Sequence, residues 1–154
     1  MKPVRVSTKA IIIENGKILL LKHEDQDGDW YCLPGGGQEN GETLKEALIR
    51  ECMEEIGATV EVKDVLFIRD YIAKNHEFKD EESLNTHQIE LMFECSIDEN
   101  YIPFTGMKPD STQKEVLWIE LKDLSKLRFY PKEMKSYLQK DIDSRVKIYL
   151  GDIN

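Results

Sequence analysis

Three carboxylates in one predicted helix have the spacing in this chain that points most directly to chemistry. Glu51, Glu54 and Glu55 stand at positions i, i+3 and i+4, so we expect their side chains to lie on one face of the helix. Like charges at this spacing repel one another and destabilise a helix unless a cation lies among them. Mg²⁺ and Mn²⁺ prefer carboxylate and carbonyl oxygens and also bind phosphate groups. The pattern therefore favours phosphate chemistry assisted by a divalent metal, and the alternative is a solvated acidic helix face.

A glycine-rich segment immediately before that helix favours the metal and phosphate interpretation. Residues 33–37 read Leu-Pro-Gly-Gly-Gly, and backbone without side chains can approach an anion or a metal closely. The helix is predicted to begin near Glu42 and Thr43, because Thr43 and Glu46 have the spacing of a capping box. Gly57 is predicted to end it, as a glycine at a helix C-terminus commonly does.

The segment from Gly36 to Ala58 resembles the signature of the Nudix hydrolases. Gly36 is followed after five residues by Glu42, and after seven more by the run Arg50-Glu51-Cys52-Met53-Glu54-Glu55-Ile56-Gly57-Ala58. Every fixed position of the signature is filled, although Cys52 and Ala58 are smaller than the aliphatic residues usual there. The resemblance implies a Mg²⁺-dependent pyrophosphohydrolase, for which Mn²⁺ could substitute. Its substrate would be a nucleoside diphosphate linked to another moiety: a nucleoside triphosphate, ADP-ribose or a nucleotide sugar.

The same resemblance implies roles for individual residues. The metal ligands would be the backbone carbonyl of Gly35 and the carboxylates of Glu51, Glu54 and Glu55. The predicted catalytic residues are Glu51, Glu54 and Arg50, with Glu51 a candidate for both metal binding and general base. Arg50 should pair with Glu42 or Glu51 and fix the orientation of that carboxylate. A catalytically silent ligand-binding or regulatory module of the same fold is the alternative, but such modules usually lose carboxylates that this chain retains.

Several residues outside the signature are weaker candidates. Some members of the family take a base or a metal ligand from another strand or loop, and for each such carboxylate a solvent-facing position is the more common outcome. These candidates are Glu90, Glu94, Glu115 and Glu120. The histidines His23, His76 and His87 are more often surface or hydrogen-bonding residues than catalysts. The aromatic residues Trp30, Tyr31, Tyr71 and Phe78 could stack on a base, although Trp30 and Trp118 suit the core equally well.

Length and composition limit the classes of protein that this chain can represent. A chain of 154 residues with 40% hydrophobic and 33% charged residues is expected to form a single domain over residues 1–154, with a core that needs no disulfides. The three cysteines are widely spaced, which favours reduced core thiols in a cytoplasmic protein. No stretch approaches the ~18 apolar residues of a membrane span, so we expect no membrane partner.

The net charge of the chain limits the kinds of partner that we expect. The net charge of −9 and the absence of a run of four basic residues disfavour a long nucleic acid. A small phosphorylated substrate carrying its own metal ions is the partner that this charge favours. A non-nucleotide polyphosphate would need a basic cluster that the sequence lacks. The oligomeric state is not determined by the sequence, although edge strands could support a homodimer.

Alternation and turn residues predict the elements that must hold these side chains. Strands are expected at 4–13, 18–21, 59–72, 87–97, 115–121 and 145–150, the first two joined by an Asn15-Gly16 turn. A helix is expected at 131–142, and loops at 23–29, 74–86 and 98–114. The third strand is expected to be irregular near residues 63–64. The predicted fold class is α/β: an α/β/α sandwich with a mixed β-sheet and a loop-helix-loop motif, which the resemblance implies as well.

Overall fold

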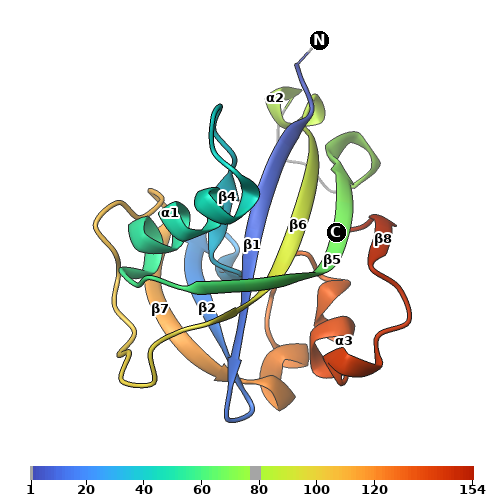
Figure 1. The fold of residues 1–154 in the computed structure, drawn as a ribbon. Coiled ribbons are helices and arrows are strands. Elements are labelled where there is room, and N and C mark those ends of the chain that lie inside the picture. The colour runs from blue at the N-terminus through green and yellow to red at the C-terminus, as the bar shows by residue number, and fades with distance from the viewer. Residues whose placement is uncertain (1, 77–80) are drawn as a thin grey trace.

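The computed structural model describes residues 2–76 and 81–154. Its fold is a mixed β-sheet with helices on either side, as predicted (Figure 1). The strands are β1 Arg5–Glu14, β2 Lys17–Asp25, β3 Gly28–Cys32, β4 Gly35–Gly37, β5 Glu61–Ile72, β6 His87–Ser96, β7 Gln113–Glu120 and β8 Tyr149–Asp152. The α-helices are α1 Leu44–Ile56, α2 Glu81–Leu84 and α3 Met134–Gln139, and the 3₁₀ turns are η1 Ala73–Asn75, η2 Leu121–Lys126 and η3 Ile142–Ser144.

Strand β1 lies at the centre of the sheet and contacts three other strands. The sheet order is β3-β2-β1-β6-β5-β8, with β4 paired to β1 and β7 paired to β2. The β1–β6 and β5–β8 pairs are parallel, and the remaining pairs are antiparallel. The turn between β1 and β2 has positive φ at Asn15 (51°) and Gly16 (74°), which confirms the predicted Asn-Gly hairpin. Residues 7–9 of β1 therefore lie between the glycine strand β4 and the long strand β6.

The core consists of two clusters, one on each side of the sheet. The first packs α1 residues Leu48, Cys52 and Ile56 against the sheet. The second packs the α3 residues Met134 and Leu138 against the opposite face. β6 contributes to both clusters, because Leu91, Phe93 and Cys95 join the first and Met92 joins the second. The helices are thus fixed by burial of apolar side chains on both faces.

The structure corrects several predicted boundaries. The loop expected at 23–29 is a hairpin, since β2 continues to Asp25 and β3 begins at Gly28. The glycine segment pairs with β1 as the short strand β4, where a loop was expected. The helix expected at 131–142 covers only Met134–Gln139, and the last strand begins at Tyr149. The predicted irregularity near 63–64 is confirmed, because the β5–β6 register shifts between Val62 and Val65. These errors fall at ends and turns, where local patterns are weakest.

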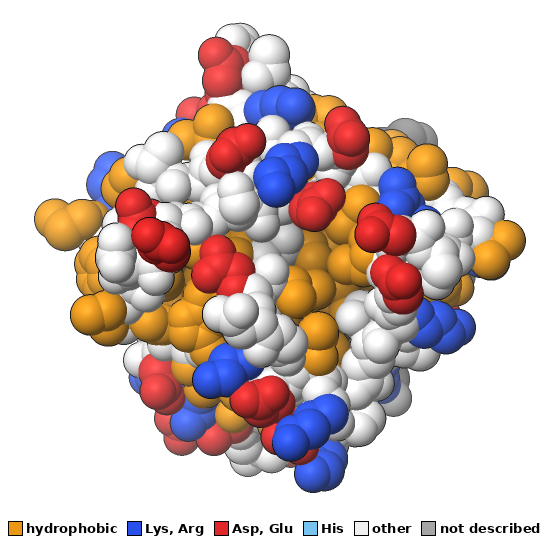
Figure 2. Space-filling model, turned by 60° about the horizontal axis from the view of Figure 1, so that its bottom comes forward, with side chains coloured by type: hydrophobic (Ala, Val, Ile, Leu, Met, Phe, Trp, Pro, Cys, Tyr) orange, Lys and Arg blue, Asp and Glu red, His pale blue; other side chains and the backbone are white. Residues whose placement is uncertain are grey.

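Within the described ranges, no helix combines the length and the apolar composition required to span a bilayer. On the face shown in Figure 2, Lys and Arg side chains alternate with Asp and Glu side chains around a hollow lined by hydrophobic groups. That face carries no basic stripe for a nucleic-acid backbone. The single domain and the homodimer stay predictions.

Candidate active site

Helix α1 is held at both ends by the caps that the sequence predicts. The Thr43 side chain accepts a hydrogen bond from the Glu46 amide, and the Glu46 carboxylate accepts one from the Thr43 amide, which completes the capping box. At the other end Gly57 has φ 64° and its amide donates to Met53 O. Ala47, Leu48 and Cys52 are buried on the inner face of the helix. The acidic positions of the signature are therefore carried by a firmly packed helix.

The glycine strand β4 brings the backbone close to that helix. Its residues pair antiparallel with β1, in the register Lys9–Gly35, Thr8–Gly36 and Ser7–Gly37. A Cβ atom on Gly36 would lie only 2.4 Å from Cδ of Glu51, and one on Gly35 would lie 2.0 Å from Thr8 O. Gly35 also has φ +136°, a conformation that favours glycine. The glycines allow the strand to fit between β1 and the Glu51 carboxylate.

Arg50 joins the glycine strand to the acidic residues. Its guanidinium donates to both carboxylate oxygens of Glu42, at 2.8 and 3.1 Å, and to Glu51 Oε1 at 2.8 Å. It also donates to Gly37 O at 2.9 Å, and its Nη1 lies 3.7 Å from Glu54 Oε1. These contacts, led by the Glu42 hydrogen bonds, hold the pKa of Arg50 above its ordinary value. The predicted pairing is confirmed, and Arg50 is a cation that relieves the crowding of acidic groups.

Glu55 faces the interior, unlike Glu51 and Glu54, which are partly exposed. It is 2% exposed and its Oε1 accepts a hydrogen bond of 2.7 Å from the Gly35 amide. Burial raises the pKa of its carboxyl to about 7, although nearby Lys9 and the Gly35 amide act in the opposite direction. A cation placed near Glu55 would therefore favour its ionised form.

Lys9 contributes a positive charge beside these carboxylates. Its ammonium donates to Gly35 O at 3.1 Å. Burial opposes that charge, but the surrounding groups outweigh burial and raise the pKa of Lys9 above its ordinary value. The groups that raise it are Cys32, Glu90, Glu55 and Asp110. Lys9 is thus protonated at neutral pH and is available to an anionic ligand.

A pocket of about 230 Å³ opens where these elements meet. Residues of β1, β4, α1, β6 and the loop before β7 line it: Arg5, Ser7, Lys9, Gly35, Gly36, Glu51, Gln88, Glu90 and Asp110. A neighbouring pocket of about 140 Å³ shares Lys9 and Glu90 with it and is also lined by Cys32, Leu33, Arg69, Tyr130 and Pro131. The first pocket combines cationic, acidic and backbone groups, which suits a phosphorylated ligand and its counterion.

The predicted metal ligands all offer oxygen donors. The oxygens of Gly35, Glu51, Glu54 and Glu55 are of the type that Mg²⁺ and Mn²⁺ prefer, and the Asp110 carboxylate belongs to the same pocket as Glu51. Over residues 2–76 and 81–154, however, no three acidic, histidine or cysteine side chains form a ready-made metal cluster. The donor chemistry fits such an ion, with side-chain adjustment required. Metal binding by these four residues stays a prediction.

The carboxylates proposed from outside the signature have different environments. Glu90 is 3% exposed, pairs with Arg69 at 3.0 Å and lines both pockets, so the solvent-facing position expected for it is wrong. Glu94 is exposed. Glu115 and Glu120 lie near surface lysines, Lys22 at 3.9 Å and Lys17 at 3.8 Å. Only Glu90 of this group borders the site.

The three histidines bind neighbouring protein groups. His23 is buried, hydrogen-bonded to Thr112 and stacked on Trp30 at 4.2 Å, and burial lowers its pKa. His76 contacts Asp152 at 2.6 Å and His87 contacts Asp70 at 3.1 Å. None of the three lines the pocket that contains Glu51. These contacts match the hydrogen-bonding alternative for histidine.

The aromatic candidates are distributed over the core and the surface. Trp118 packs against the first core cluster and Tyr31 against the second, while Tyr71 stacks on His76. Phe78 lies outside the described residues.

Cys32, Cys52 and Cys95 are free thiols. Burial raises the pKa of Cys32 and of Cys95 to about 12, as expected for unreactive core cysteines.

Four charged residues that line these two pockets were not among the predicted site residues: Arg5, Lys9, Arg69 and Asp110. Lys9 and Arg69 each adjoin a run of four apolar residues, 10–13 and 65–68, and a charged residue beside such a run is a signal for a buried site. Arg5 and Asp110 lie in polar surroundings and carry no such local signal. The loop that contains Asp110 is tied to α1, because Gly106 donates to Glu55 O and Lys108 donates to Glu54 O.

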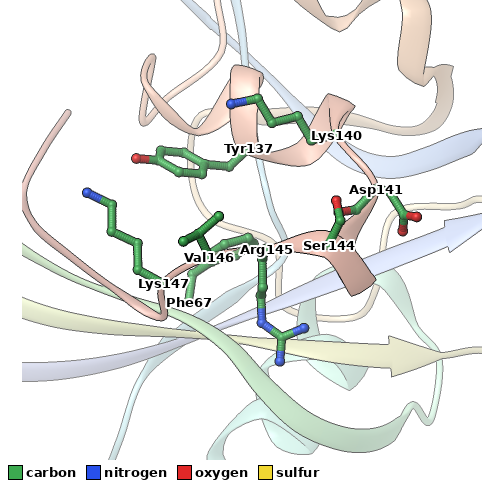
Figure 3. A pocket seen from close by; sticks show the side chains of 8 residues that line it. All are labelled: Phe67, Tyr137, Lys140, Asp141, Ser144, Arg145, Val146 and Lys147. Carbon is green, nitrogen blue, oxygen red and sulfur yellow. The ribbon is translucent and has the colours of Figure 1, made fainter.

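A different pocket lies on the α3 side of the sheet (Figure 3). Its volume is about 450 Å³, and its lining residues are Phe67, Tyr137, Lys140, Asp141, Ser144, Arg145, Val146 and Lys147. The Tyr137 ring and Val146 border its interior in Figure 3. It contains no residue of the signature and one carboxylate, so it lacks the acidic groups that metal-assisted hydrolysis requires.

Comparison with known proteins places these features in context. A family model described as the NUDIX domain matches residues 3–140. An ADP-ribose pyrophosphatase of Methanocaldococcus jannaschii is 30% identical over 136 residues, covering 87% of this chain and 73% of its own length. A nucleoside triphosphatase NudI of an Enterobacter species is 32% identical over 131 residues, covering 79% of this chain and 92% of its own length.

Solved structures share the fold at lower sequence identity. A NUDIX hydrolase from Nitrosomonas europaea has a TM-score of 0.72 at 21% identity, covering 100% of this chain and 81% of its own. The MutT NUDIX hydrolase from Burkholderia pseudomallei has a TM-score of 0.67 at 22% identity, covering 89% and 98%. At these identities the likeness extends to the arrangement of helices and strands.

Proposed function

The chain belongs to the Nudix hydrolase family, as a pyrophosphohydrolase, and we propose that it cleaves a nucleoside diphosphate linked to another moiety. Water attacks phosphorus, and the substrate is a nucleoside triphosphate, ADP-ribose or a nucleotide sugar. The observation that carries the proposal is the pocket in which Glu51, Gly36 and Lys9 lie together. The names of the two relatives support a nucleotide substrate, although they differ in which nucleotide it is.

The protein's own groups have separate tasks in this reaction. Lys9 attracts the anionic diphosphate, since its ammonium is charged and lines the pocket. Arg50 fixes the Glu51 carboxylate beside Gly36, so that this oxygen donor is already oriented when substrate binds. The Asp110 and Glu90 carboxylates border the same space and are further candidates for accepting the proton of the attacking water.

A divalent metal belongs to this proposal. Members of the family generally use one, and here Glu51, Glu54, Glu55 and the carbonyl of Gly35 would hold Mg²⁺, with Mn²⁺ as a substitute. When bound, the metal neutralises phosphate charge and acidifies water. In the adjoining pocket the ring of Tyr130 would stack on the base of the nucleoside.

Glutamine variants test the proposal. The purified protein is incubated with Mg²⁺ and a panel of nucleoside triphosphates, ADP-ribose, nucleotide sugars and dinucleoside polyphosphates, and released phosphate or pyrophosphate is measured. Glu54→Gln and Glu55→Gln should each lower kcat by about 100-fold or more, with a normal circular dichroism spectrum. Glu94→Gln is the matched control, since Glu94 is exposed on β6. Near-normal turnover in both folded variants would refute the role of these carboxylates, and binding without any turnover would indicate the silent module.

A further inference from the structure

Three pockets follow one another along strands β1 and β6. Arg5, Ser7 and Lys9 alternate along β1, so their side chains share one face of the sheet. Arg5 lines both the pocket that contains Glu51 and a larger pocket of about 650 Å³ near the N-terminus, and Lys9 lines both the Glu51 pocket and the Tyr130 pocket. On β6, His87 lines the large pocket and Gln88 lines the Glu51 pocket. Glu90 lines both the Glu51 pocket and the Tyr130 pocket. Since Arg5 pairs with Gln88 and Ser7 with Glu90, the two strands form a common floor.

We propose that the large pocket beside Arg5 binds the second moiety of a disubstituted diphosphate, so that the preferred substrate carries a sugar or nucleoside on each side of its diphosphate. This inference rests on the proposed function, because it places the diphosphate in the middle pocket beside Glu51. Arg5 and Lys9 are four residues apart in a strand, which corresponds to ~13 Å. That span suits a diphosphate with a group attached at either end.

The surroundings of Arg5 prepare it to hold a phosphate oxygen. Its guanidinium packs on Gly37, where a Cβ atom would lie 2.7 Å from Nη2. Within the part of the chain that the structure describes, no ion pair or hydrogen bond engages its side chain. An arginine fork with free donors matches the oxygens of a phosphate. Its position between two pockets places it next to the phosphate that bears the second moiety.

The size and the polar lining of the large pocket favour a hydroxyl-rich group. Its polar walls include Gln38, Asn40, Asn85 and Thr86, whose amides and hydroxyls can donate and accept hydrogen bonds. Its charged residues are Lys2, Arg5 and Glu39, with His87 as the titratable ring. The volume of about 650 Å³ is within the range of pockets that bind whole small molecules. A terminal phosphate would fill little of this volume.

The experiment compares substrates of the two classes on one set of variants. Values of kcat and KM are measured with Mg²⁺ for ADP-ribose and UDP-glucose, which carry a second moiety, and for ATP and dGTP, which do not. The variants are Arg5→Ala, Arg5→Lys, Asn40→Trp and Asn40→Ala. Lys17→Ala is the surface control, because Lys17 lies at the distant β1–β2 hairpin with its ammonium 3.8 Å from Glu120.

We expect the wild-type protein to favour the disubstituted substrates by about tenfold or more in kcat/KM. Arg5→Ala should raise KM for ADP-ribose about tenfold to a hundredfold with a smaller change in kcat, and Arg5→Lys should recover part of the loss. Asn40→Trp fills the large pocket and should lower the ADP-ribose to ATP ratio of kcat/KM about tenfold, whereas Asn40→Ala should change it less. Lys17→Ala should match the wild type.

Two results would overturn the inference. One is a wild-type preference for the triphosphates. The other is a KM for ADP-ribose that changes less than about twofold in both Arg5→Ala and Asn40→Trp, since contacts to charged groups contribute more than that. Both leave the proposed function intact if hydrolysis still requires Glu54. Different results would contradict the proposed function itself. These are no hydrolysis of any substrate in the panel, or hydrolysis that is unchanged by Glu54→Gln.

Discussion

The buried ion pair between Arg69 and Glu90 offers a sharp test of the electrostatics around the site. Arg69 Nε lies 3.0 Å from Glu90 Oε1, and the two side chains are only 8% and 3% exposed. Arg69 also donates to Ile153 O at 2.6 Å, and Gln88 donates to Glu90 at 3.0 Å. Glu90→Gln removes one charge and preserves the shape of the side chain, so Arg69 is left as a buried cation with a neutral partner.

The size of the effect follows from this burial. Removing one partner of a buried pair costs about 3–5 kcal/mol, because the remaining charge has lost both water and its counterion. A glutamine at position 90 could still accept one hydrogen bond from Arg69, so the lower end applies, about 3 kcal/mol. Replacing both residues by apolar ones, Arg69→Met with Glu90→Leu, should bring stability back to within about 1 kcal/mol of the wild type.

Urea unfolding at pH 7, followed by circular dichroism, measures these differences as shifts of the midpoint at constant slope. Glu94→Gln is the matched control, because it makes the same substitution on an exposed position of the same strand, and it should change stability by less than about 0.5 kcal/mol. A Glu90→Gln protein as stable as that control would refute the reasoning. So would a double variant that is less stable than Glu90→Gln alone.

Three further predictions concern the glycine strand, the C-terminus and the metal. Gly36→Ala should lower kcat by about 100-fold with a nearly unchanged melting temperature. The reason is that the added Cβ would lie 2.4 Å from Cδ of Glu51 and displace its carboxylate. A wild-type kcat in this variant would contradict the prediction. Burial opposes the charge on Asp152, but hydrogen bonds from Asn75, His76 and the Ile72 amide outweigh burial and lower its pKa to about 2 from 3.8. Because the folded-state pKa is depressed, this carboxylate stabilises the protein above pH 4 and loses its effect as pH falls from 4 to 2. Asp152→Asn should therefore cost about 1 kcal/mol at pH 7, after allowance for solvent screening, and much less near pH 2. Urea unfolding across this range would reveal an equal loss at both ends if the reasoning were wrong. Millimolar Mg²⁺ should raise the melting temperature of the wild type at neutral pH and have less effect on Glu54→Gln, and a melting curve indifferent to the ion would count against metal binding by the folded protein.

Helix α1 and its acidic residues were predictable because their determinants are local. Capping by Thr43 and Glu46, termination at Gly57 and the buried stripe all depend on residues within one or two turns of one another. The partner of Arg50 was predictable for a related reason, since an arginine within an acidic helix has carboxylates in reach. Loop and strand ends were predicted less well, and the segment from His23 to Asp29 failed because β3 pairs with a strand extension that carries polar residues.

The remainder of the site depends on contacts between residues distant in the sequence, and no local pattern encodes them. Lys9 reaches Gly35 because β4 pairs with β1, and Glu90 joins the same pocket because β6 lies parallel to β1 on its other side. Parallel pairing can join strands at any separation along the chain, so the sequence allowed several partners for β1. The same pairing gives the side chains their order: every second residue of β1 enters a new part of the site, from Arg5 through Ser7 to Lys9. A one-residue shift in the β1–β6 register would move Lys9 and Glu90 to opposite faces of the sheet. The buried Arg69–Glu90 pair fixes the adjoining β5–β6 register in the same way, since a shift there would leave each charge buried without its partner.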